Sequence, residues 1–139
     1  MGYTTTFENG FIFDKPVSIE LYKKVNEFSK ERHEPGNGIP GYYCQWVIND
    51  FGELVWDGGE KFYSYVEWLE YLIDNFFKPD GYILNGEVEY QGEDPEDFGT
   101  IEVVDNVIIQ HFGIHALDLT GISTDDLIKE LKRRGYLLT

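Results

Sequence analysis

The sequence has few basic residues and almost no cysteine. Eleven Lys and Arg residues stand against 26 Asp and Glu residues, which gives a net charge of −15. Such a surface repels nucleic acids and anionic lipids, so direct binding of either is not expected. Cys44 is the only cysteine, which excludes a disulfide framework and a multi-cysteine metal site within this sequence. We therefore expect a reducing, cytoplasmic location.

Long hydrophobic runs and targeting segments are also missing. No stretch approaches the roughly 20 apolar residues of a membrane span, and residues 1–6 lack the basic and apolar regions of a signal peptide. Apolar residues nevertheless make up 42% of the 139 residues, and aromatic residues 17%, which is enough for one well-packed core. We expect a single folded domain that does not bind membranes.

The negative charge is concentrated in the middle of the chain. Residues 1–34 contain six acidic and five basic residues, residues 35–111 contain sixteen and two, and residues 112–139 contain four of each. The middle segment therefore carries −14 of the net charge of −15. This predicts an acidic surface that attracts a basic partner. The alternative is that the charge only keeps the protein in solution.

Hydrophobic periodicity predicts an α+β fold. Helices are expected over 18–32, 61–77 and 124–134, and strands over 3–7, 10–13, 42–48, 53–56, 82–91, 100–104 and 107–112. Asn9-Gly10 is a favoured hairpin dipeptide, so the first two strands are expected to pair with each other. We predict a core domain over 1–111, with a mostly antiparallel sheet of five or six strands and two helices on one face. A helical extension is expected over 112–139.

The strand predicted over 82–91 is followed by an acidic loop, and together they suggest a docking surface. Side chains alternate between the two faces of a strand, and an antiparallel sheet with helices on one face leaves the other face in water. The predicted docking surface for a basic protein consists of the polar residues of this strand and loop: Asn85, Glu87, Glu89, Gln91, Glu93, Asp94, Glu96 and Asp97. The alternative is an ordinary solvated face.

Two of these carboxylates allow a second interpretation, a small hydrolase or ligand-binding pocket. On one strand Glu87 and Glu89 would lie ~7 Å apart, which suits a glycosidase-like pair. The pocket would be formed by Trp46, Trp56, Glu60, Glu87 and Glu89. Nothing in the sequence supplies the burial that would separate the pKa values of the two carboxyl groups. We therefore interpret the chain as a binding protein rather than an enzyme, with no catalytic residue and no cofactor.

The sequence predicts no metal site. His111 and His115 are four residues apart, and in an extended segment that places them ~13 Å from each other. The acidic residues of the 93–97 segment do not follow the spacing of a calcium-binding loop.

The segment over 112–139 is neutral and contains an amphipathic helix with a basic end. Packing of this helix on the core is one interpretation, because short helices are rarely stable alone. Contact with another protein or with a second copy is the other. A structural homo-oligomer held by 112–139 is therefore a third functional alternative.

Four motifs are distinctive: YCQW over 43–46, WDGGEKFY over 56–63, YVEWLEYLI over 65–73, and LNGEVE over 84–89 followed by QGED over 91–94. They resemble a family of small bacterial and phage proteins that has no assigned activity. The likeness covers about residues 1–110, and the chain departs from it in a short loop over 33–41 and an added segment from 112. A phage or mobile-element origin would imply an inhibitor that engages a basic, nucleic-acid-binding surface of a host protein in the host cytoplasm.

Overall fold

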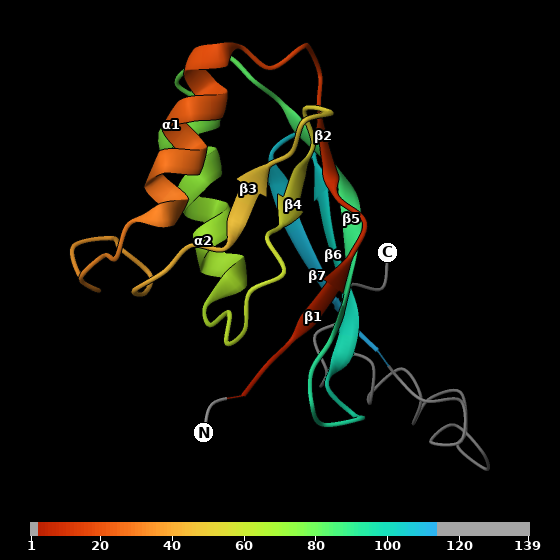
Figure 1. The fold of residues 1–139 in the computed structure, drawn as a ribbon. Coiled ribbons are helices and arrows are strands. Elements are labelled where there is room, and N and C mark those ends of the chain that lie inside the picture. Colours follow the sequence, from red (N-terminus) through yellow and green to blue (C-terminus); the bar gives the residue numbers. More distant parts are fainter. Residues whose placement is uncertain (1–2, 114–139) are drawn as a thin grey trace.

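Seven strands form one antiparallel sheet, and two helices cover one of its faces (Figure 1). The structure is a computed structural model that describes residues 3–113. The predicted α+β class is confirmed, whereas the helix predicted over 124–134 lies outside the described residues. The elements are β1 (Thr6–Glu8), β2 (Phe11–Phe13), α1 (Ile19–Lys30), β3 (Trp46–Ile48), β4 (Leu54–Trp56), α2 (Tyr65–Leu72), the π-helical turn η1 (Ile73–Phe77), β5 (Leu84–Gln91), β6 (Phe98–Val104) and β7 (Val107–Phe112).

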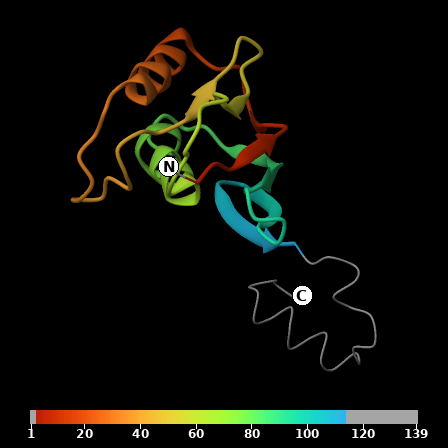
Figure 2. The same cartoon turned by 60° about the horizontal axis from the view of Figure 1, so that its bottom comes forward.

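The strands lie in the order β3-β4-β2-β5-β6-β7, and β1 also pairs with β5. After rotation of the molecule, α1 and α2 still lie on the same side of the sheet (Figure 2). The β6–β7 hairpin turns at Asp105-Asn106, where both residues have positive φ (47° and 70°), as a two-residue hairpin turn of this kind requires. This turn is where the sequence predicts it.

The predicted hairpin between the first two strands is wrong. Glu8 pairs with Glu89 and Phe11 pairs with Gly86, so β1 and β2 run along β5 in one continuous register. Asn9 has a φ of 73°, which interrupts the strand without reversing it. The long β5 strand supplies backbone partners for both segments, and that outweighs the local preference of Asn-Gly for a hairpin turn.

The two helices differ in how closely they follow the predicted ranges. Helix α1 begins as expected, because the Leu21 backbone N–H donates to the Ser18 side-chain oxygen at 3.1 Å. Helix α2 begins at Tyr65, four residues later than predicted. Lys61 and Ser64 both have positive φ (59° and 56°), so the chain from 61 to 64 is not helical.

The core between the helices and the sheet is largely aromatic. Trp46 is fully buried, and its ring centroid lies 5.3 Å from those of Phe7 and Phe62 and 5.7 Å from that of Phe11. Such edge-to-face contacts add to the free energy of burying these rings. The inner faces of β3 and β5 are therefore used for packing, which leaves the opposite face of the sheet for other contacts.

The β3 edge of the sheet is blocked by side chains of α1. The Asn26 amide accepts from the Ile48 backbone N–H at 2.8 Å and donates to the Ile48 carbonyl at 2.9 Å. One turn later, the Ser29 hydroxyl donates to the Trp46 carbonyl at 2.6 Å. Covered edges do not recruit strands from other molecules, so α1 protects this edge.

Cys44 is expected to be inert in the folded protein. The residue is fully buried, and this burial raises the pKa of its thiol to about 11, against the weaker opposing effect of the Trp46 carbonyl. At pH 8 about one thiol in a thousand would be ionised, and only the thiolate reacts. Ellman's reagent should therefore react slowly with native protein and stoichiometrically in denaturant. Rapid reaction without denaturant would contradict the buried position.

Candidate docking face

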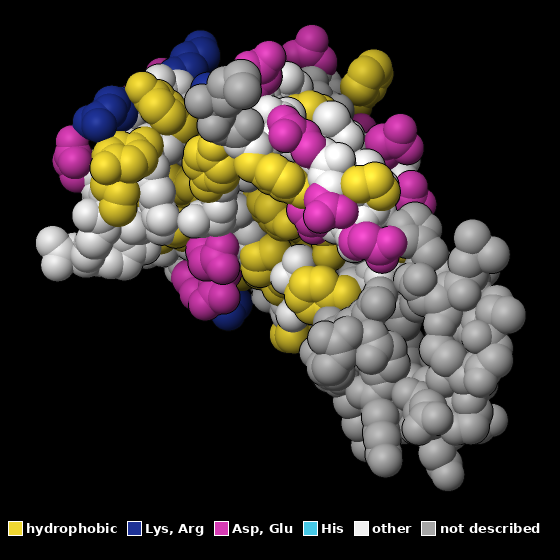
Figure 3. Space-filling view, turned by 90° about the horizontal axis from the view of Figure 1, so that it is seen from below, with side chains coloured by type: hydrophobic (Ala, Val, Ile, Leu, Met, Phe, Trp, Pro, Cys, Tyr) yellow, Lys and Arg dark blue, Asp and Glu magenta, His cyan; other side chains and the backbone are white. Residues whose placement is uncertain are grey.

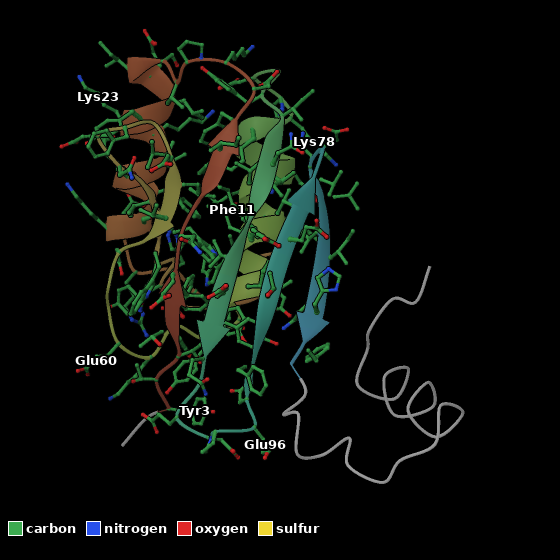
Figure 4. The ribbon with its side chains drawn as sticks, turned by 90° about the vertical axis from the view of Figure 1, so that its right-hand side faces the viewer. Tyr3, Phe11, Lys23, Glu60, Lys78 and Glu96 are labelled. Atoms are coloured by element: carbon green, nitrogen blue, oxygen red, sulfur yellow. The ribbon has the colours of Figure 1, made fainter. Side chains whose placement is uncertain are left out.

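The face of the sheet opposite the helices carries a group of carboxylates (Figure 4). Alternation along β5 turns Val88 and Tyr90 into the core and leaves Glu87 and Glu89 exposed. Asn85 and Gln91 have the same parity, so the four strand residues predicted to share a face do share it. We call the four glutamates of this surface, Glu8, Glu87, Glu89 and Glu102, the acidic sheet face.

These glutamates lie directly opposite one another on paired strands. Glu8 of β1 is the register partner of Glu89, and Glu102 of β6 is the register partner of Glu87. Directly opposed residues have Cβ atoms about 4.5–5.5 Å apart. Strands β1, β2, β5, β6 and β7 contain no Lys or Arg, so within these strands no permanent positive charge offsets the cluster.

One histidine borders the acidic sheet face. The His111 ring nitrogen lies 3.1 Å from a Glu102 carboxylate oxygen, and Thr100 separates His111 from Glu89 in the register. The Glu102 contact becomes an ion pair only when the imidazole is protonated. Seen from below, several Asp and Glu side chains lie at the right, on the side of the open face, and others lie at the left and lower centre beside Lys and Arg side chains (Figure 3).

Two of the four carboxylates of the acidic loop, those of Glu93 and Asp97, bind the N-terminal segment. Tyr3 donates its hydroxyl to the Asp97 carboxylate at 2.7 Å and accepts from the Asp94 backbone N–H at 3.1 Å. The Glu93 carboxylate accepts from the Thr4 backbone N–H at 3.0 Å. Asp94 also accepts from the Glu96 N–H at 2.9 Å. These contacts assign Glu93, Asp94 and Asp97 a structural role.

The predicted Glu/Trp pocket is not formed. Trp46 and Trp56 are register partners whose rings pack with Phe7 on the helix side of the sheet, whereas Glu87 and Glu89 are on the opposite face. Glu60 lies in the loop before α2, where its carbonyl accepts from the Gln45 amide at 2.8 Å. The sheet lies between the two Trp side chains and the Glu87 and Glu89 side chains. Side chains that point to opposite faces of a sheet cannot line one pocket.

Within residues 3–113, no three His, Cys, Asp or Glu side chains are grouped to hold a metal ion. Among the same residues, no helix has the length and apolar character needed to cross a bilayer.

The fold and this face define an α+β domain with an open, acidic sheet surface. Comparison of the chain with known protein families, with curated proteins and with solved structures found no match.

Two features of the surface were missed by reasoning from sequence. Glu8 joins the acidic sheet face only because β1 pairs with β5, and no local signal in the sequence indicates that pairing. The second is a groove around Phe51 that is lined in part by exposed apolar side chains. A signal for it exists, since Phe51 occupies the third position of the Asn49–Gly52 turn, where polar residues or glycine are usual.

Proposed function

We propose that the protein is a non-catalytic binding protein whose acidic sheet face engages a basic surface of another protein. The observation that carries this proposal is the direct opposition of like charges in two neighbouring pairs, Glu8 with Glu89 and Glu87 with Glu102. Each such pair destabilises a sheet, by up to about 1 kcal/mol. Charge that served only solubility could be placed elsewhere on the surface without this cost.

A surface that normally holds nucleic acid is the proposed target, because its Lys and Arg side chains supply the complementary potential. The resemblance to phage and bacterial proteins supports a host protein as the partner and inhibition as the outcome. The hydrolase alternative has no formed pocket to support it. The homo-oligomer alternative depends on the 112–139 segment, and nearly all of this segment lies outside the described residues.

Reversing two charges on the face is expected to abolish partner capture. Tagged wild-type protein is used to isolate partners from its native host, which are identified by mass spectrometry and then purified. Glu87→Lys/Glu89→Lys should weaken binding of the purified partner by at least about tenfold, because both attractive contacts become repulsive. Binding by the wild type should also weaken as salt is raised.

A matched control separates the face from the overall charge. Glu67→Lys/Glu70→Lys makes the same change in net charge on exposed positions of α2 and should leave binding nearly intact. The face variant should melt at or slightly above the wild-type temperature, because each new Lys lies opposite a Glu. Equal loss of binding in both variants, or retention in the face variant, would contradict the proposal.

A further inference from the structure

A groove lies at one end of the sheet, between the connection from β2 to α1 and the turn from β3 to β4. Its volume is about 910 Å³. Large apolar side chains around it are exposed to an unusual degree: Phe51 is 88% exposed, Ile19 71% and Ile12 54%. Scattered exposed apolar residues need no explanation, but several around one groove mark an interaction site.

The turn that carries Phe51 is held in one conformation. The Asn49 side-chain oxygen accepts from the backbone N–H groups of Phe51 and Glu53 at 3.0 and 2.9 Å. Gly52 donates its N–H to the Asn49 carbonyl at 3.1 Å and has a φ of 79°. The Tyr22 hydroxyl donates to Asp50 at 3.3 Å, which ties the turn to α1.

This arrangement presents an aromatic side chain to solvent on a rigid support. None of the other described residues buries Phe51, and most of its side chain is exposed. Because the backbone of the turn is already fixed, little backbone entropy is lost when the ring binds, and aromatic side chains are among the residues that dominate interface energetics. We therefore expect Phe51 to contribute a large share of the binding energy of any partner that occupies the groove.

The polar groups around the groove are mainly acidic. Asp14, Asp50 and Glu53 border it, against the single cation Lys15. The Lys15 ammonium lies 4.6 Å from the centre of the Tyr82 ring, which holds it to one side. A lining that combines exposed apolar side chains with acidic groups is complementary to a large apolar side chain flanked by Lys or Arg.

We propose that this groove docks a partner segment in which a large apolar side chain is flanked by Lys or Arg residues. The proposal rests on the proposed function and deepens it, because the groove continues the acidic sheet face: Ile12 is the register partner of Asn85, on the same strand as Glu87 and Glu89. The acidic sheet face supplies attraction to any basic surface, and the groove selects among basic surfaces.

A short synthetic peptide with Trp and Leu between Lys and Arg residues tests the groove by fluorescence anisotropy. We expect it to bind the wild type at least about tenfold more tightly than the same peptide with Ser in place of Trp and Leu. Phe51→Ser should remove this difference. Asp50→Lys should weaken binding a few-fold. Tyr43→Ser, which removes another exposed aromatic ring outside the groove, should have no effect.

Three results would overturn the groove proposal. The Ser-substituted peptide could bind as tightly as the apolar one. A peptide with Glu in place of Lys and Arg could bind better. Sedimentation velocity could show that the chain associates with itself through Phe51, in which case the occupant is a second copy.

The captured partner distinguishes this inference from the proposed function. If Glu87→Lys/Glu89→Lys loses the partner and Phe51→Ser retains it, the groove proposal fails and the role of the acidic sheet face stands. If Phe51→Ser loses the partner and the charge-reversed variant retains it, the role of the acidic sheet face fails.

Discussion

Replacing Trp46 with alanine is expected to lower the free energy of unfolding by about 3–5 kcal/mol, the usual cost of removing a large aromatic side chain from a core. Trp46 is fully buried at the centre of the aromatic cluster. Its indole N–H donates to the Tyr65 carbonyl at 2.8 Å, at the first residue of α2. The substitution therefore leaves a cavity and removes the hydrogen bond that joins β3 to the start of α2.

Urea denaturation followed by far-ultraviolet circular dichroism measures this effect without depending on tryptophan fluorescence. Because domains of this size have total stabilities of about 5–15 kcal/mol, the loss is a large fraction of the total, and the urea midpoint should fall clearly. Trp46→Phe retains most of the volume and should cost less. Tyr43→Ala on the surface should change stability by less than about 0.5 kcal/mol. An unchanged urea midpoint for Trp46→Ala would show that the aromatic cluster does not hold the helices to the sheet.

Replacing Asn26 with alanine is expected to destabilise the protein and to cause it to associate. The change removes both hydrogen bonds to the Ile48 backbone. Leaving partly buried polar groups unpaired costs about 1–3 kcal/mol for each group. The opened β3 edge also exposes backbone donors and acceptors that another strand can pair with.

Two measurements check the role of Asn26. Urea denaturation should show the loss of stability, and light scattering at increasing concentration should show more association than the wild type does. Asn26→Asp keeps the acceptor and loses the donor, so it should give an intermediate effect. Asn75→Ala, which removes only an exposed side-chain contact to the Tyr71 carbonyl, serves as the control. A stable Asn26→Ala variant that does not associate would refute edge protection by α1.

Local sequence patterns were sufficient to predict those features whose hydrogen bonds or side-chain directions depend on a few neighbouring residues. The Ser18 cap, the Asp105-Asn106 turn and the alternation of Asn85, Glu87, Glu89 and Gln91 could all be read from neighbouring residues. The helix start at Tyr65 could not. It depends on positive φ values at Lys61 and Ser64, and the nearby Gln45 side chain that binds the Glu60 carbonyl comes from a distant segment.

The composition of the acidic sheet face was only partly predictable for the same reason. Glu93, Asp94 and Asp97 have the same acidic character in the sequence as Glu87 and Glu89. Their contacts with Tyr3 and Thr4 join positions about 90 residues apart, so their structural role is visible only after folding. Glu8 shows the reverse case, because it joins the surface through pairing with β5.

The sequence by itself determined the α+β class, the side of β5 that faces water, and the surplus of negative charge, because alternation and composition are local properties of the chain. Tertiary structure decided which carboxylates meet. Strand pairing placed Glu8 opposite Glu89 and Glu87 opposite Glu102. It placed Trp46 and Trp56 on the other face of the sheet from these glutamates. Folding also brought the turn that carries Phe51 beside α1. Register is fixed by the packing of the whole sheet, and no single segment contains that information.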